Sequence, residues 1–181
     1  MKSLEEKQIL FTSLVLKYNK THNITGAKNT NDIEKNIQDS LFPLTFLETK
    51  STQKIVDIGS GAGFPGLVLA MALPDTHFYL FEPIAKKSAF LHLAKTVIEL
   101  NNVSIFTQRI EDAEPFEADI ICSRAVTQTQ TLINLCQKFI SKKTILLLYK
   151  GERVVDELPK NGEYEIHKKD KRNYLTIKGL L

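Results

Sequence analysis

The chain has 181 residues, of which 43% are hydrophobic and 25% charged, with a formal net charge of +3 at pH 7. This length and composition are those of one soluble globular domain with a full core. No uninterrupted apolar run approaches the roughly 20 residues that span a bilayer, and the amino end lacks the apolar core of a signal peptide. We therefore expect a cytoplasmic protein without a membrane partner, whose mildly basic charge permits a nucleic-acid partner but does not require one.

The first 50 residues predict two helices that pack onto the rest of the chain. A capping box of Ser3 and Glu6 starts the first helix. Apolar residues then recur four positions apart at Leu10, Leu14 and Tyr18, and a second helix repeats this spacing at Ile33, Ile37 and Leu41. Because no low-complexity linker follows, we expect a single domain in which a helical extension, residues 1–50, packs on an α/β core, residues 51–181.

The segment from Ile55 to Gly66 is an apolar run followed by alternating glycines and then by the start of a helix. Glycines at alternate positions remove side chains from a strand-to-helix turn, so a nucleoside-sized ligand can lie against bare backbone at the carboxyl edge of a sheet. This pattern indicates a nucleoside-containing cofactor. A glycine-rich turn that binds no ligand is the simpler alternative.

Two cofactors fit the spacing of these glycines. Read from Gly61, the pattern Gly-x-Gly-x-x-Gly matches the dinucleotide fingerprint, in which helix amides face a pyrophosphate. That register would place Asp57, Gly59 and Ser60 at the end of a buried parallel strand, where a charge is disfavoured. Read from Asp57, the pattern Asp-x-Gly-x-Gly-x-Gly resembles motif I of class I S-adenosylmethionine methyltransferases, and we favour this second interpretation.

After Asp57, short β-branched or aromatic runs alternate with longer helical stretches, which predicts an α/β fold with a parallel sheet. Strands are expected at Lys54 to Ile58, His77 to Phe81, Val103 to Thr107, Ala118 to Cys122 and Thr144 to Tyr149. Helices are expected at Pro65 to Leu73, Ala85 to Leu100 and Thr129 to Phe139. A closing pair, Tyr164 to Lys168 and Asn173 to Lys178, would end this Rossmann-like, mostly parallel sheet with an antiparallel strand, as the methyltransferase motif implies.

Several segments together resemble one family, the 16S ribosomal RNA guanine-N7 methyltransferases, also called glucose-inhibited division protein B. The resemblance covers nearly the whole chain and rests on Asn23-Ile24-Thr25, Asp39-Ser40-Leu41, Gly59 to Gly66, Ser123-Arg124-Ala125 and Lys150-Gly151. The Gly-Phe-Pro-Gly ending and the Ser-Arg-Ala turn are more specific than the glycines alone. One departure is that Lys35-Asn36 stands where the family usually has an Arg-His pair, which leaves no histidine in that helix to carry a role.

The resemblance implies a binding site for S-adenosyl-L-methionine. Its expected contacts are the bare backbone at Gly59 and Gly61, the ring of Phe64, Ile110 and Glu111 around the adenine, and Arg124. Glu82 is expected to accept hydrogen bonds from the ribose hydroxyls, because it lies about 20 residues past the glycines at a strand end. Phe64 could equally pack into the core, and Arg124 could instead clamp an RNA phosphate or bind guanine O6.

The implied substrate is guanine N7 in 16S ribosomal RNA, within small ribosomal subunit particles, and the enzyme is expected to act as a monomer. Guanine N7 carries a free lone pair, so orientation rather than a general base would promote its methylation, and no catalytic residue is predicted. The alternatives are a nicotinamide-dependent oxidoreductase and a non-catalytic RNA-binding or cofactor-sensing module.

Basic residues gather in two places, at Lys17, Lys20, Lys28 and Lys35 and again from Lys168 to Arg172. These clusters, and Lys150, either contact RNA or form solvated surface. Cys122 and Cys136 lie in apolar contexts and are expected to be buried, reduced thiols. The four histidines lack the spacing of metal ligands, so no metal is expected.

Overall fold

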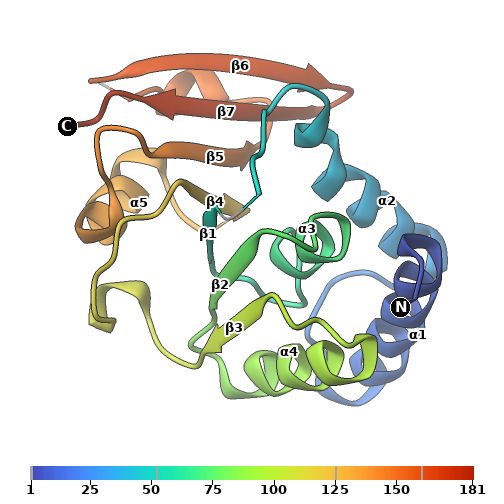
Figure 1. The fold of residues 1–181 in the computed structure, drawn as a ribbon. Helices are drawn as coiled ribbons and strands as arrows, with labels where there is room; N and C mark the ends of the chain where they lie inside the picture. Colours follow the sequence, from blue (N-terminus) through green and yellow to red (C-terminus); the bar gives the residue numbers. More distant parts are fainter. Residues whose placement is uncertain (1, 52, 125, 160) are drawn as a thin grey trace.

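The computed structural model describes residues 2–51, 53–124, 126–159 and 161–181. Within these residues, seven strands form one sheet in the order β3-β2-β1-β4-β5-β7-β6, and helices cover both of its faces (Figure 1). The strands are β1 (Lys54–Ile58), β2 (His77–Phe81), β3 (Val103–Phe106), β4 (Ile120–Arg124), β5 (Ile145–Lys150), β6 (Glu163–Lys169) and β7 (Arg172–Lys178). The helices are α1 (Leu4–His22), α2 (Thr30–Leu41), α3 (Gly66–Ala72), α4 (Ala85–Ile98) and α5 (Thr129–Cys136). Short 3₁₀ turns lie at η1 (Phe42–Thr45), η2 (Ile110–Asp112), η3 (Gln137–Phe139) and η4 (Val154–Glu157).

The sheet confirms the predicted fold class. Strands β1 to β5 pair in parallel, and β7 is antiparallel to both β5 and β6. Parallel pairing places the carboxyl ends of β1, β2 and β4 at one edge, where open α/β folds bind their ligands. Two strands end later than predicted: β4 continues to Arg124 rather than ending at Cys122, and β5 continues to Lys150 rather than ending at Tyr149. The predicted helix Thr129 to Phe139 is divided into α5 and η3.

The extension packs its helices onto the face of the sheet that also carries α3 and α4 (Figure 1). The predicted capping box is present, with the Ser3 hydroxyl accepting from the Glu6 N–H and the Glu6 carboxylate accepting from the Ser3 N–H. The predicted apolar stripe of α1 was displaced by one residue. Its fully buried residues are Phe11 and Val15, whereas Leu10, Leu14 and Tyr18 are only partly buried.

Helix α2 packs on the sheet through the apolar residues that its sequence pattern predicts. Ile33 and Ile37 are buried as predicted, and the Tyr149 hydroxyl of β5 donates 2.8 Å to the backbone carbonyl of Ser40. On the other face, α5 covers a separate apolar cluster. Both cysteines are buried and free, as expected.

None of the helices in the described part of the chain is long and apolar enough to cross a membrane. The same residues hold no group of three or more His, Cys, Asp or Glu side chains that is arranged to hold a metal ion.

We propose that extension and core unfold as one unit, and Phe11 tests this. Its ring centroid lies 5.2 Å from that of Phe64 and 6.3 Å from that of Phe90, so it joins α1 to the core. Phe11→Ala is expected to lower the free energy of unfolding by about 3–5 kcal/mol in a single urea transition. The control Ile9→Ala, at a side chain that is 63% exposed, should change it by less than about 0.5 kcal/mol. Two separate transitions would contradict the proposal.

Candidate active site at the carboxyl edge of the sheet

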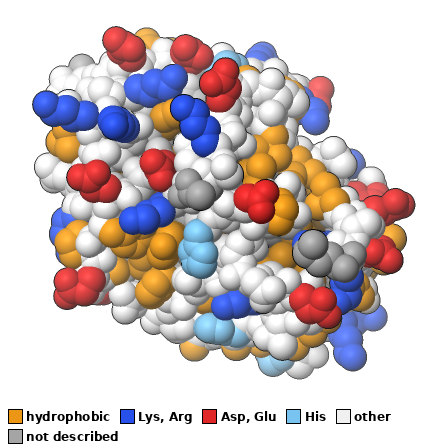
Figure 2. All heavy atoms as spheres, viewed as in Figure 1, with side chains coloured by type: hydrophobic (Ala, Val, Ile, Leu, Met, Phe, Trp, Pro, Cys, Tyr) orange, Lys and Arg blue, Asp and Glu red, His pale blue; other side chains and the backbone are white. Residues whose placement is uncertain are grey.

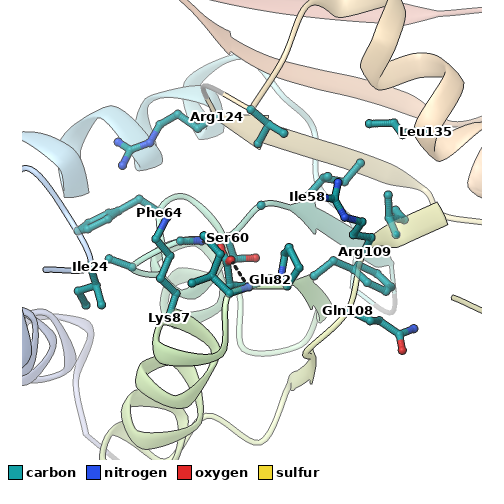
Figure 3. A pocket seen from close by; sticks show the side chains of 18 of the residues that line it. Ile24, Ile58, Ser60, Phe64, Glu82, Lys87, Gln108, Arg109, Arg124 and Leu135 are labelled. Atoms are coloured by element: carbon teal, nitrogen blue, oxygen red, sulfur yellow. Dashed lines mark hydrogen bonds between the residues drawn. The ribbon is translucent and has the colours of Figure 1, made fainter. Parts of the chain in front are cut away.

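A cavity of about 470 Å³ lies at the carboxyl edge of the sheet, among the ends of β1, β2 and β4. This volume is within the range of small-molecule sites. The structure brings all the predicted cofactor-site residues to its lining: Gly59, Gly61, Phe64, Glu82, Ile110, Glu111 and Arg124. Figure 3 shows Ile24, Phe64 and Arg124 toward one end of the cavity, Gln108, Arg109 and Leu135 toward the other, and Glu82 between them.

The glycine turn has one bare position that faces the cavity and one that faces the protein. Gly61 has φ +58°, and a Cβ added there would meet nothing nearer than the Gly59 carbonyl oxygen at 3.8 Å. Gly59 also has a positive φ, of +71°, but a Cβ there would come within 2.5 Å of Val126 Cγ2. The predicted reason for a glycine, bare backbone toward a ligand, therefore applies to Gly61. At Gly59 the positive φ is what favours glycine, because the close atom belongs to the exposed side chain of Val126 in the loop after β4.

Glu82 is buried immediately after β2 and holds the glycine turn in place. Its Oε2 accepts from the Gly61 N–H at 2.8 Å, and its Oε1 accepts from the Ile84 N–H at 2.9 Å. Because a carboxylate offers about four lone-pair positions, these bonds leave acceptor capacity for hydroxyl groups in the cavity. Glu82 is only 3% exposed, so it is not a solvated carboxylate at a strand end.

Asp57 overturns one step of the sequence argument. Its charge lies inside the buried strand β1, in the position where a charge was expected to be disfavoured. The carboxylate is compensated instead, because its Oδ2 accepts from the Gly66 N–H at 3.0 Å and its Oδ1 from the Cys122 thiol at 3.6 Å. Burial still dominates and raises the pKa of Asp57 to about 6.

The same contact argues against the dinucleotide interpretation on firmer grounds. Gly66 is the first residue of α3, and its N–H is bonded to the Asp57 carboxylate. The next two amides, of Leu67 and Val68, point to the Gly63 carbonyl oxygen. A pyrophosphate needs free amides at a helix N-terminus, whereas here an acidic side chain already occupies that position.

At the end of the cavity near η2, which follows β3, an apolar wall lies beside one carboxylate. Ile110 is buried in η2, and Glu111 beside it is partly exposed. Arg109 Nη1 lies 3.7 Å from Glu111 Oε1, while Leu135 of α5 closes the opposite wall. The loop that was expected to seat an adenine is therefore neither a free surface loop nor wholly polar.

At the opposite end, Arg124 is held by the extension. Its Nη1 donates to Asn36 Oδ1 at 2.9 Å and to Asp39 Oδ2 at 3.3 Å, both on α2. Its guanidinium carbon lies 5.0 Å from the centroid of the Phe64 ring, a cation–π arrangement. Phe64 satisfies both sequence interpretations, because it is 3% exposed in the core and also lines the cavity. Ala125 of the Ser-Arg-Ala turn lies outside the described residues.

Sequence reasoning assigned no role to several lining residues. Ile24 and Thr25 lie in the quoted Asn-Ile-Thr segment, but nothing local indicated that the loop after α1 reaches this edge. Lys87 also lines the cavity, and its place in the first turn of the helix after Glu82 was an available signal. Val126 could be found only through its approach to Gly59.

For Lys150, by contrast, the sequence suggested an exposed position, and the structure shows a nearly buried one. Its Nζ lies 2.7 Å from Glu157 Oε2 and 3.1 Å from the Thr127 carbonyl oxygen, with 11% of the side chain exposed. It therefore ties the loop after β4 to η4. The interpretation of Lys150 as a solvated loop lysine was therefore wrong, whereas the RNA contact stays a prediction.

The fold identifies the class of protein to which the chain belongs. A solved ribosomal protein L11 methylase from Lactobacillus delbrueckii subsp. bulgaricus aligns with a TM-score of 0.64, covering 86% of this chain and 80% of that one at 10% identity. TYW2 of M. jannaschii, solved in complex with AdoMet, aligns with a TM-score of 0.61, covering 80% and 73% at 19% identity. The fold is that of class I methyltransferases.

The family follows from the sequence matches. The family model GidB, described as rRNA small subunit methyltransferase G, matches residues 4–179. The ribosomal RNA small subunit methyltransferase G of Wolinella succinogenes is 47% identical over 170 residues, which is 94% of this chain and 87% of that protein. The chain belongs to the rRNA small subunit methyltransferase G family, which confirms the resemblance drawn from its motifs.

The buried charge of Asp57 predicts a pH-dependent stability. The folded pKa of about 6 lies above the ordinary value of 3.8, so stability falls as pH rises through this window and the loss is complete above about pH 6. Two pKa units correspond to about 3 kcal/mol. Asp57→Asn keeps an acceptor for the Gly66 N–H and loses the charge. Its stability relative to wild type should therefore rise by about 2 kcal/mol between about pH 4.5 and 7.5 in urea unfolding, and parallel pH curves would refute this.

Proposed function

We propose that this chain transfers the methyl group of S-adenosyl-L-methionine to N7 of a guanine in 16S ribosomal RNA. One observation supports the cofactor assignment above the others. A cavity of nucleoside size has bare backbone at Gly61 directly beside the carboxylate of Glu82. Family membership supports the ribosomal substrate.

The residues present fit an adenosyl group with an amino-acid tail. Glu82 keeps lone pairs for the ribose hydroxyls, and Ile110 with Leu135 offers apolar walls for a purine. Gly61 leaves the space that any side chain would fill. Arg124 carries the only guanidinium toward the Phe64 end among the described lining residues, so it is the group we assign to the tail or to the incoming base.

The chemistry asks for orientation rather than proton transfer. S-adenosyl-L-methionine supplies a methyl group on a sulfonium, and the N7 lone pair displaces the sulfur in line to leave S-adenosylhomocysteine and N7-methylguanine. Because N7 carries no proton, the protein needs no general base. The two carboxylates of the lining have other contacts, Glu82 with two backbone amides and Glu111 with Arg109 at 3.7 Å, and neither is assigned the role of a base. Correct placement of two reactants can supply about 7–11 kcal/mol.

We propose further that the substrate is the small ribosomal subunit particle and that the enzyme acts in the cytoplasm as a monomer. Incubation with radiolabelled methyl donor and unmodified small subunits tests the reaction. The expected product is one labelled guanine that becomes sensitive to reduction and aniline-induced scission, as N7-methylguanine is. RNA binding without label transfer would favour the non-catalytic module.

Calorimetry separates the oxidoreductase alternative. S-adenosylhomocysteine is expected to bind and NAD is not, because the Asp57 carboxylate stands at the start of α3 where a pyrophosphate would lie. Tight NAD binding without any response to S-adenosylhomocysteine would reverse the proposal.

Gly61→Val tests the cofactor cavity. A β-branched side chain at φ +58° is strained and would project into the space assigned to the adenosyl group. Affinity for S-adenosylhomocysteine should fall at least about 100-fold, roughly 3 kcal/mol. The matched control is Gly151→Val, where an added Cβ meets nothing within 4 Å and φ is not positive; its affinity should be unchanged. Equal affinity in the two variants would remove Gly61 from the site.

A further prediction concerns the pH dependence of the chemical step. Since no proton leaves guanine N7, single-turnover methyl transfer should keep a constant rate between about pH 7 and pH 9. Quenched-flow measurements with saturating donor and subunits isolate this step. A tenfold rise per pH unit would reveal an essential base and contradict the assigned chemistry.

A further inference from the structure

A second hollow, of about 730 Å³, lies between α2 and the hairpin of β6 and β7. It shares no lining residue with the first cavity. Its lining, which we call the hairpin groove, consists of cations, carboxylates, amides and one phenol: Lys35, Lys169, Lys171, Arg172, Glu34, Asp39, Asp170, Asn31, Asn36, Gln38 and Tyr174. Figure 1 places the turn of this hairpin beside the end of α2.

The net charge of the chain does not locate a docking surface. Figure 2 shows cationic and anionic side chains interspersed over the viewed face. The local structure is more informative, because it divides the basic tract near the carboxyl end. In the β6–β7 register Lys169 lies opposite Arg172, and Lys168 lies opposite Asn173. Successive strand residues point to opposite faces, so Lys168 and Lys169 belong to different surfaces.

Lys169 lies on the groove side of the hairpin. Its Nζ is 5.0 Å from the centroid of Phe42, in the turn that follows α2. Lys168 is exposed and does not line the groove. Two lysines that are adjacent in sequence and equal in charge therefore provide an internal comparison.

Asp39 connects the groove to the first cavity. Its Oδ1 accepts from Arg172 Nε at 3.0 Å and from the Tyr174 hydroxyl at 2.9 Å, while its Oδ2 accepts from Arg124. The Asp39 side chain is 15% exposed, and its carboxylate forms ion pairs with the guanidiniums of Arg124 and Arg172. Since Arg124 also lines the first cavity, the row Arg124, Asp39, Arg172 forms the wall between the two hollows.

The remaining charges favour an anionic partner. Lys169 and Lys171 form no ion pair with any described residue. The two other acidic residues of the lining, Glu34 and Asp170, are exposed, as are Lys35 and Lys171. With Asp39 bound to Arg172, three lysines of the lining remain against two carboxylates. Cations beside amide side chains are the groups that bind phosphates and base or ribose edges in RNA complexes, and the lining offers no exposed aliphatic side chain for a membrane or an apolar peptide.

Resting on the proposed function, we propose that the hairpin groove docks the RNA strand that carries the target guanine. Lys169 and Lys171 contact its phosphates, and the amides of Asn31 and Gln38 contact its bases or riboses. The strand then crosses the Arg124, Asp39, Arg172 row to deliver the guanine to the first cavity. RNA docking is thereby separated from cofactor binding, and the two can be measured independently.

The test compares two double variants that each remove two positive charges. Lys169→Gln with Lys171→Gln alters the groove without touching Asp39. Lys168→Gln with Lys143→Gln is the matched control, since Lys168 lies on the other surface and Lys143 is exposed in the turn before β5. Binding of unmodified 16S ribosomal RNA is measured over a salt series. The groove pair should lose at least about tenfold in affinity, and its salt slope should fall by about 1.4 in magnitude, or about 0.7 for each single-strand phosphate contact. The control pair should stay within about twofold.

Parallel measurements make the outcomes distinguishable. Both pairs should bind S-adenosylhomocysteine as wild type does, which shows that the fold is kept. Lys169→Met, which preserves the alkyl stem over Phe42, should reproduce the loss if charge is responsible. Equal losses in the two pairs would overturn the groove while leaving the proposed function intact. If the groove pair binds naked RNA normally but binds small subunits more weakly, the groove contacts a protein, and the proposal of an RNA-docking groove is overturned. If the wild type binds neither naked 16S ribosomal RNA nor small subunits, both the docking groove and the proposed substrate are wrong.

Discussion

Two buried carboxylates hold the glycine turn from opposite sides, and the shape of the first cavity depends on them. Asp57 accepts the Gly66 N–H at the start of α3, and Glu82 accepts the Gly61 N–H in the middle of the turn. A carboxylate is costly to bury unless hydrogen bonds satisfy it, and a backbone that turns through glycines needs partners for its amides. These hydrogen bonds satisfy both the carboxylates and the amides, so the turn is fixed while Gly61 adds no side chain to the cavity.

The extension completes the site that the sheet begins. Phe11 of α1 packs edge-on against Phe64, which lines the cavity. Asn36 and Asp39 of α2 bind Arg124 from outside the sheet, and Asp39 also accepts from the Tyr174 hydroxyl of β7. Burial and this carboxylate raise the pKa of Tyr174, so the phenol remains a donor. A core without α2 would lack both the hairpin groove and the Asp39 contact that joins it to the first cavity.

Local pattern was enough to predict the order of strands and helices, because hydrophobic periodicity and turn residues are properties of short segments. It also placed Glu82 correctly, since the end of β2 has a fixed relation to the end of β1 in a parallel sheet. The stripe of α1 was displaced because apolar residues occupy neighbouring positions on that helix, so several stripes fit the spacing almost equally well. Periodicity alone does not choose among them.

What local pattern could not supply is the partner of each polar side chain. Asp57 was judged by the general cost of a charge in a strand, yet its compensation comes from an amide nine residues later in the chain. Lys150 was judged as a loop residue, and its partner Glu157 lies beyond the end of the strand. The bond between Asn36 and Arg124 joins positions 88 residues apart. These pairings are set by the packed fold, where a buried polar group must find whatever partner the fold brings near.

Asn36 shows what such a pairing implies about the chemistry. The resemblance drawn from the sequence led to the expectation of a histidine at this position, and the Oδ1 of Asn36 accepts from Arg124 at 2.9 Å. A neutral imidazole could accept the same bond, but a protonated one would repel the guanidinium, so its contact would change between about pH 5 and 8. An amide accepts at every pH. Glu82 is likewise bonded to two amides, so Glu82 and Arg124 are both held at the cavity by contacts that need no proton transfer. That arrangement suits a reaction whose nucleophile has no proton to lose and whose rate depends on where the two reactants are held.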